Sequence, residues 1–222
     1  MMTAALLALA DSRLPAGGHA HSGGIEQAIT TGVIGDPVSL AGFLRRRLTT
    51  AGAVAAGLAA AACRAVDVAD PAAVRPADLL AALDAEADAR TPSPAQRAAS
   101  RQQGRGLVRV ASRAWPDPAW ASLPAQPHHP LALGVAAATA GLTPRDAAHA
   151  AAYLAVSGPA TAAQRLLAMD PITVAAVTAR LSPEIDRVAD DAAAGDLPAD
   201  TDPLLDLLAE VHAARNDRFF AS

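Results

Sequence analysis

The sequence contains no lysine, and all of its positively charged side chains are arginines. Without lysine there can be no Walker A phosphate loop and no Schiff-base catalysis. Cys63 is the single cysteine, so internal disulfides and zinc sites built on cysteine pairs are excluded. A lone cysteine is typical of a reducing compartment, and we therefore expect a cytoplasmic protein.

Aromatic residues make up only 3% of the chain, and the net charge of −4 gives no basic excess. Because nucleic-acid-binding domains are usually basic, we expect no nucleic-acid partner. The alanine-rich stretch without charge between Arg47 and Arg64 is shorter than the roughly 20 apolar residues of a membrane span. The start of the chain has no basic leader before its apolar run. We therefore expect neither a membrane anchor nor a secretion signal.

Alanine dominates the sequence, and it favours helix over strand. No alternating run of β-branched or aromatic residues indicates a strand. The pattern predicts an all-α, single-domain bundle of roughly ten short helices that spans residues 1–222. The expected helices lie near residues 2–10, 23–32, 37–66, 76–89, 95–115, 130–141, 144–156, 159–168, 171–180, 183–194 and 203–215.

Most helix starts carry a capping residue followed by proline, which suits the first helical turn. These pairs are Asp36-Pro37, Asp70-Pro71, Thr143-Pro144, Asp170-Pro171, Ser182-Pro183 and Asp202-Pro203. Two longer connections remain. Residues 11–22 form a glycine-rich polar loop, and residues 116–129 are expected to form an exposed loop because they carry several prolines.

Residues 11–26, here called the N-terminal motif, read Asp-Ser-Arg-Leu-Pro-Ala-Gly-Gly-His-Ala-His-Ser-Gly-Gly-Ile-Glu. Glycines before a helix can cradle an anion, and His19 and His21 could contribute to a metal site. The alternative is structural: the glycines permit a tight turn and Ser22 caps the next helix. We favour the structural alternative, because no lysine follows the glycines and two ligands are too few for a tight metal site.

An arginine ladder with a spacing of four runs through Arg97, Arg101, Arg105, Arg109 and Arg113. Like charges at this spacing repel one another on a helix, so the ladder requires acidic residues opposite it. These acids could be internal, since Asp84, Glu86 and Asp88 lie on the preceding helix. They could also belong to an acidic protein partner, because arginine suits interfacial ion pairs. Both alternatives stay open, and both can hold for different arginines.

Two further features are weighed in the same way. His128 and His129 stand in the proline-rich loop, where adjacent histidines are usually solvated. Residues 216–222, the C-terminal tail, contain Phe219 and Phe220, which either fold back onto the body or are presented to a partner. We favour partner binding, because arginine and aromatic residues are enriched at interface hot spots.

No catalytic constellation is present: the chain lacks a Gly-x-Ser-x-Gly elbow, a His-Glu-x-x-His helix and a dinucleotide fingerprint after a strand. The sequence therefore predicts a binding protein rather than an enzyme, with no cofactor. The alternative function is a small helical metal-binding protein that uses His19, His21, His128 and His129.

Several segments resemble the urease accessory protein UreF family. The first helix leads into Asp11-Ser12, Pro15-Ala16-Gly17 and Ser22-Gly23-Gly24-Ile25-Glu26, which match the N-terminal hallmark of that family in order. Similar segments follow at residues 100–105 (Ser-Arg-Gln-Gln-Gly-Arg), at residues 162–167 (Ala-Ala-Gln-Arg-Leu-Leu) and at residues 218–222 (Arg-Phe-Phe-Ala-Ser). The chain departs from the family at Met169-Asp170, where Gly-Gln is common, and at His212-Ala213, where His-Glu is common.

The resemblance implies an all-helical homodimer that assists nickel insertion into apo-urease. It implies a bridge between UreD, also called UreH, and the GTPase UreG, without GTP hydrolysis by this chain. The partner-binding residues would be Arg101, Gln103, Gly104, Arg105, Arg165, Arg218, Phe219, Phe220 and Ser222. The functional residues of the N-terminal motif would be Asp11, Pro15, Gly17, His19, His21, Ser22, Gly23 and Glu26.

Overall fold

The computed structural model describes the chain except for residues 1–3, 12–13, 15–20, 67–74, 218 and 221–222. The described part contains helices and no strand, which confirms the all-α prediction. The α-helices are α1 (Ala4–Ala10), α2 (Ile25–Thr30), α3 (Pro37–Arg47), α4 (Ala53–Val66), α5 (Pro76–Ala89), α6 (Pro94–Ala114), α7 (His129–Thr139), α8 (Pro144–Leu166), α9 (Pro171–Arg180), α10 (Ser182–Ala194) and α11 (Pro203–Ala213). A π-helical turn, η2 (Leu48–Gly52), joins α3 to α4, and a 3-10 helix, η3 (Pro118–Ser122), follows α6.

The predicted caps explain where four of these helices begin. Asp36, Thr143, Asp170 and Asp202 each accept a hydrogen bond from a backbone N–H of the first turn, and a proline follows each of them. Ser182 was wrongly predicted as a cap, because α10 begins at Ser182 itself and Leu181 precedes it without a side-chain cap. The pair Asp70-Pro71 lies outside the described residues.

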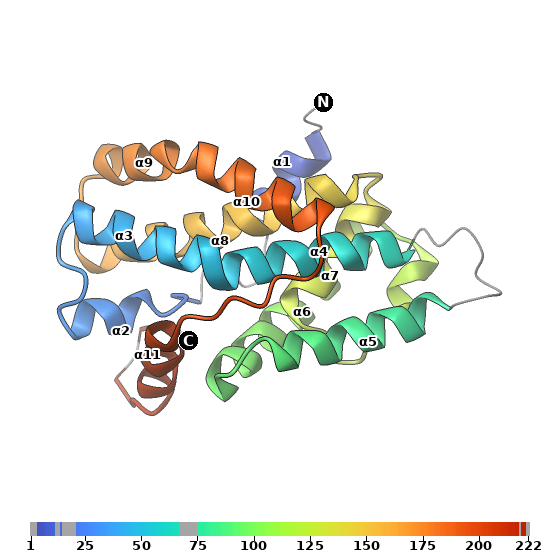
Figure 1. The fold of residues 1–222 in the computed structure, drawn as a ribbon, viewed down its shortest axis with the longest axis horizontal. Coiled ribbons are helices and arrows are strands. Elements are labelled where there is room, and N and C mark those ends of the chain that lie inside the picture. The colour runs from blue at the N-terminus through green and yellow to red at the C-terminus, as the bar shows by residue number, and fades with distance from the viewer. Residues whose placement is uncertain (1–3, 12–13, 15–20, 67–74, 218, 221–222) are drawn as a thin grey trace.

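Helices α4, α7 and α8 form the centre of the molecule, and α4 runs across the middle of the view in Figure 1. The facing side chains are mostly alanines, so the helix axes can approach closely. Gly134 of α7 shows how close the contact is. A Cβ atom there would overlap the carbonyl oxygen of Ala59 and lie 2.7 Å from the Cβ of Ala62. The alanine-rich composition therefore builds a core with little room for larger side chains.

Residues Pro37–Val66 form one helical rod through α3, η2 and α4, as the sequence predicted. By length and composition, this rod is the one helix among the described residues that could cross a membrane, with a mean hydropathy of 1.3 in its most apolar window. More than half of that window is buried inside the protein, against α7 and α8. Such burial is what the central helix of a folded core shows.

The prediction of two helices at 144–156 and 159–168 was wrong. Helix α8 continues from Pro144 to Leu166 with Pro159 inside it. The rod Pro37–Val66, at 30 residues, is likewise longer than the short helices expected for most of the bundle. A proline inside a helix removes one backbone hydrogen bond and usually ends or kinks the helix. Here the carbonyl that loses its helical donor, that of Ala155, accepts a hydrogen bond from Arg47 instead, and the helix continues.

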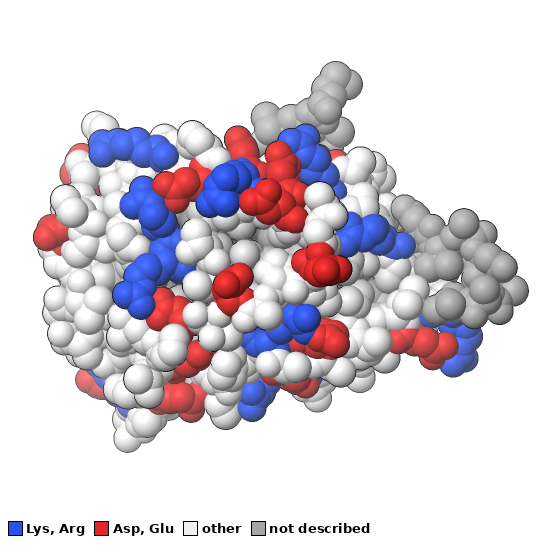
Figure 2. Space-filling model, in the orientation of Figure 1, with Lys and Arg blue, Asp and Glu red and all other residues white. Residues whose placement is uncertain are grey.

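The outer elements lie on two sides of the rod (Figure 1). Helices α9 and α10 lie along one side, and α5 and α6 along the other. The segment after α10 crosses α4, where Gly57 leaves room for Pro198, and leads to α11 beside α2. On the face shown in Figure 2, basic and acidic side chains are interspersed, so no extended surface of one sign is present on that face.

Candidate functional site

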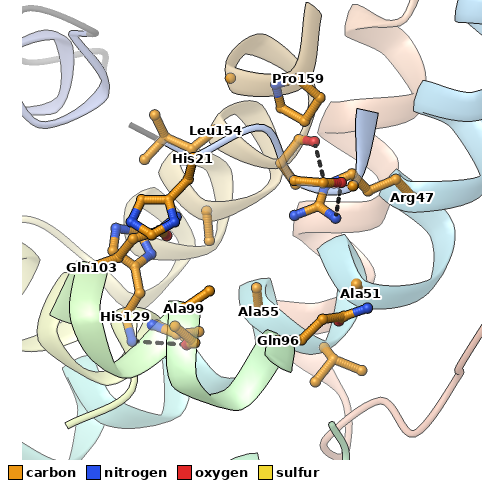
Figure 3. Close-up of a pocket in the computed structure, with 18 of the residues that line it drawn as sticks. His21, Arg47, Ala51, Ala55, Gln96, Ala99, Gln103, His129, Leu154 and Pro159 are labelled. Atoms are coloured by element: carbon orange, nitrogen blue, oxygen red, sulfur yellow. Dashed lines mark hydrogen bonds between the residues drawn. The ribbon is translucent and has the colours of Figure 1, made fainter. Parts of the chain in front are cut away.

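A cavity of about 280 Å³ lies where segments from both ends and the middle of the chain meet (Figure 3). It brings together residues from each segment that resembles the UreF family, although these segments are far apart in the sequence. The residues of those segments that line the cavity are Asp11, His21, Gly23, Gly24, Ser100, Gln103, Ala162, Arg165 and Phe220. We take this cavity and the contacts around it as the candidate functional site.

Gly23, Arg47 and Pro159 meet at one wall of the cavity (Figure 3). Pro159 has no N–H, so the carbonyl of Ala155 one turn earlier lacks its helical donor. The Nε of Arg47 donates to that carbonyl at 3.2 Å, and its Nη1 donates to the carbonyl of Gly23 at 3.0 Å. Arg47 therefore joins the N-terminal motif to the point where the proline interrupts α8.

Gly23 of the N-terminal motif is required by the same contact. Gly23 has φ +60°, a backbone conformation that favours glycine. A Cβ atom at Gly23 would lie 3.0 Å from Cγ of Pro159 and 3.1 Å from Cζ of Arg47. The structural alternative for this glycine is therefore supported. The expected cap at Ser22 is wrong, because α2 has Gly24 at its N-cap position with no side-chain hydrogen bond, and Ser22 is fully buried.

Glu26 joins the N-terminal motif to the C-terminal tail. Its buried carboxylate accepts hydrogen bonds from the backbone N–H groups of Phe219, at 2.8 Å, and Phe220, at 2.9 Å. It also lies 3.0 Å from Nε2 of His212, which is completely buried in α11. Burial raises the pKa of Glu26, but these hydrogen bonds outweigh it, so the pKa lies below its usual value. The carboxylate is therefore ionised and holds the backbone of Phe219 and Phe220 against the N-terminal motif.

The two phenylalanines of the tail differ in their surroundings. Phe220 packs against the core and lines the cavity, while the side chain of Phe219 is 86% exposed. Arg215 steadies this region by donating to Gln27 and pairing with Asp217. Phe220 thus folds back onto the body, and partner binding stays a prediction for the exposed Phe219. The other residues that we predicted to be functional, Pro15, Gly17, His19, Arg218 and Ser222, lie outside the described residues.

The arginine ladder also divides into two parts. Arg101 pairs with Asp84 at 2.9 Å and with Asp88 at 2.7 Å, and Nε of Arg97 lies 3.9 Å from Asp88. Arg105 donates to the side chain of Gln126 and remains exposed. The last two members, Arg109 and Arg113, are exposed and form no ion pair with a described residue. The internal alternative therefore holds for the start of the ladder, and the end of it faces solvent.

The expectation that His128 is solvated was wrong. His128 is 1% exposed, with Nδ1 3.0 Å from Oγ of Ser100 and Nε2 2.9 Å from Asp88. Gly104 makes this possible, because a Cβ atom there would overlap the carbonyl oxygen of Pro127 and lie 3.0 Å from the carbonyl carbon of His128. The end of the connection 116–129 is thus packed against α6, and only part of it is an exposed loop.

His129 faces the cavity together with His21 (Figure 3). Burial lowers the pKa of His129 to about 4, and the nearby His21 contributes to that shift, so the imidazole is neutral at pH 7. In the described part of the chain, no three histidine, cysteine, aspartate or glutamate residues are placed to hold a metal ion. The metal-binding alternative gains no support from this geometry, and His19 lies outside the described residues.

The sequence reasoning missed Arg47 and Pro159. Arg47 belongs to a run of three arginines, and Arg45 and Arg46 pair with Glu184 and Asp202 while Arg47 turns inward. Pro159 was taken as a helix boundary. A proline within an apolar helical stretch was the available signal, but its partner is 112 positions away in the sequence.

The fold and the site define a class of all-helical protein in which segments far apart in the sequence meet around one cavity. A family model described as UreF matches residues 34–182. The chain is 52% identical over 219 residues to the urease accessory protein UreF of Mycobacterium sp. (strain JLS), covering 98% of this chain and 97% of that protein. It is also 52% identical to UreF of Mycolicibacterium vanbaalenii, with 99% and 98% covered, and 47% identical to UreF of Mycobacterium tuberculosis (strain H37Rv), with 99% and 98% covered.

The chain belongs to the UreF family of urease accessory proteins. Its members assist urease maturation and are not themselves catalytic.

Proposed function

We propose that this protein acts in urease maturation as an adaptor that holds UreD (UreH) and the GTPase UreG together on apo-urease while nickel is inserted. In this proposal it is a cytoplasmic homodimer of single-domain chains that binds proteins and hydrolyses no GTP. Membership of the UreF family supports the part in urease maturation. The observation that carries the adaptor role is the exposed Phe219, whose backbone N–H donates to the buried Glu26.

The tail and α11 offer an apolar surface next to the N-terminal motif. Glu26 holds the backbone of Phe219 in place, so the exposed ring is presented from a fixed position. Leu207 and Val211, one helical turn apart on α11, are also exposed, at 64% and 51%. A rigid aromatic anchor loses little conformational freedom on binding, which favours affinity. We assign UreD to this surface.

The exposed end of the arginine ladder offers a second surface. Arg105, Arg109 and Arg113 share one face of α6, because their spacing of four brings them together on a helix. An acidic surface on a partner would relieve their mutual repulsion, and arginine suits such interfacial pairs. We expect this face to contribute to assembly of the maturation complex.

A titration of UreD with tail variants tests the role of the tail. Deletion of residues 218–222 and Phe219→Ala should both weaken UreD binding, with Phe219→Ala raising the Kd about tenfold or more if the ring is an interface hot spot. Ile172→Ala is the matched control, because Ile172 is equally exposed on the distant α9. An unchanged Kd for both tail variants would reject this role.

A further inference from the structure

Arg47 is a cation at the cavity wall that lacks a counter-ion within the described chain. Its neighbours in the sequence, Arg45 and Arg46, pair with Glu184 and Asp202. The guanidinium of Arg47 binds two backbone carbonyls, and no described carboxylate lies within the 4.0 Å of an ion pair. Burial lowers the pKa of Arg47 to about 10, so it is still charged at pH 7. A partly buried charge without a carboxylate partner loses part of its hydration uncompensated, and this one calls for an anion.

The guanidinium has donors left for such an anion. An arginine side chain carries five N–H donors. One on Nε and one on Nη1 are used by the carbonyls of Ala155 and Gly23, which leaves three. Figure 3 shows the terminal nitrogen without a dashed bond directed into the cavity. The planar guanidinium matches the two oxygens of a carboxylate.

The remaining walls fit a small ligand with an apolar part. The methyl groups of Ala51 and Ala55 line the cavity on the side of Arg47, and Ala99 lines it beside His129 (Figure 3). The amide of Gln103 and the neutral imidazole of His129 supply further polar atoms. At about 280 Å³ the cavity is at the lower limit of the usual range for ligand pockets.

Carboxylates also line the cavity, but they belong to other segments. Asp202 pairs with Arg46, and burial together with Asp202 and Glu210 raises the pKa of Asp206. Asp11 and Asp200 complete the acidic lining. None of the four forms an ion pair with Arg47 within the described chain. Two further arginines, Arg90 and Arg165, also line the cavity, and Arg90 pairs with Glu86.

We propose that the cavity binds a short-chain carboxylate, with its oxygens on Arg47 and its carbon chain against the alanine wall. The ligand would join α3, the N-terminal motif and the proline interruption of α8 through one guanidinium. This site goes beyond the adaptor role and belongs to the isolated chain, so its test needs no urease component and its failure would leave the proposed function standing.

Thermal unfolding of the purified chain in sodium acetate, against sodium chloride at equal ionic strength, tests the site. Saturating acetate should raise the Tm by about 2–4 °C over chloride. Arg47→Gln should abolish the rise by removing the charge. Since Arg47 also supports the fold, Ala99→Leu provides a second variant, which narrows the cavity and leaves the arginine in place. Arg45→Gln, at the surface pair with Glu184, is the control and should keep the rise.

Saturation-transfer NMR on acetate with the same variants gives a readout that does not depend on stability. The wild type and Arg45→Gln should transfer signal to the acetate methyl group, and Ala99→Leu should not. Equal Tm values of the wild type in acetate and chloride would overturn the proposal. So would a rise, or a transfer signal, that survives Ala99→Leu.

Discussion

Two contacts in this protein depend on a glycine: that between α4 and α7, and that between α8 and the N-terminal motif. They differ in the residues that surround the glycine and in how tightly these pack. At Gly134 the neighbours are alanines and backbone, and the helices touch without a gap. At Gly23 the neighbours are a proline ring and a guanidinium, and a cavity lies beside them. The first contact is a tight apolar core. The second is polar and hollow, and the family-like segments gather around it.

This difference separates stability from recognition within one small protein. Alanine packing lets a chain with few aromatic residues bury a core. The polar contacts at Arg47 and Glu26 add less stability, but they fix where the tail and the motif lie. Substitutions in the two regions should therefore separate unfolding from loss of partner binding.

Gly134→Ala should have the largest effect on stability. The new methyl group would overlap Ala59 and crowd Ala62, so α4 and α7 must separate, at about 3 kcal/mol of unfolding free energy, or a Tm lower by roughly 6–12 °C. Gly158→Ala is the control, because nothing lies within 4 Å of its Cβ position in α8. It should be neutral or stabilise by up to about 1 kcal/mol. Equal unfolding free energies for the two variants would contradict the tight contact.

The pH dependence of the unfolding free energy should report on the cavity, through His129. The folded pKa of His129 is about 4, below the 6.5 of an unperturbed histidine, so between these values the unfolded chain binds a proton that the folded chain does not. The free energy of unfolding should therefore fall as the pH drops from 6.5 to 4, by at most about 3 kcal/mol. His129→Gln should flatten this decline, and His149→Gln, near the surface, should not. Denaturant unfolding at several pH values measures both.

Glu26→Gln should loosen the tail with little change to the core. The neutral amide keeps the shape but weakens the hydrogen bonds to the N–H groups of Phe219 and Phe220, at about 2 kcal/mol. Hydrogen exchange at those two amides should accelerate while exchange in α7 stays the same. Because the folded pKa of Glu26 is lowered, the same release should occur in the wild type as the pH falls through that lowered pKa, below the usual range of a glutamate. Protection unchanged by the substitution would exclude Glu26 as the anchor.

The arginine ladder should give the smallest effects on stability. Arg101→Gln removes a partly buried pair with Asp84 and Asp88 and should cost about 1–2 kcal/mol. Arg109→Glu and Arg113→Glu should leave the Tm within about 2 °C and reduce formation of the maturation complex. If these two substitutions lower stability and spare assembly, the end of the ladder serves the fold alone.

The sequence was informative where local chemistry decides structure. Asp36, Thr143, Asp170 and Asp202 marked helix starts because capping involves only neighbouring residues. The same local reasoning failed at Pro159, because the donor that allows α8 to continue comes from Arg47, on a distant part of the chain.

The candidate site was predictable to the same extent, in its local segments but not in the distant contacts between them. The sequence pointed to the right segments through their resemblance to a family, and the ladder pairs with Asp84 and Asp88 were among the alternatives it offered. It could not show that Glu26 holds the tail, or that His128 is buried under Gly104. Both depend on side chains that meet only after the helices have packed.

The most direct measurement is the nickel content and activity of urease produced by co-expression with UreD and UreG, in the presence or absence of this chain. The account predicts that urease made with the chain is loaded and active, that urease made without it holds little nickel, and that the Phe219→Ala variant lies between them. Equal nickel content and activity with and without the chain would contradict its role as an adaptor in maturation.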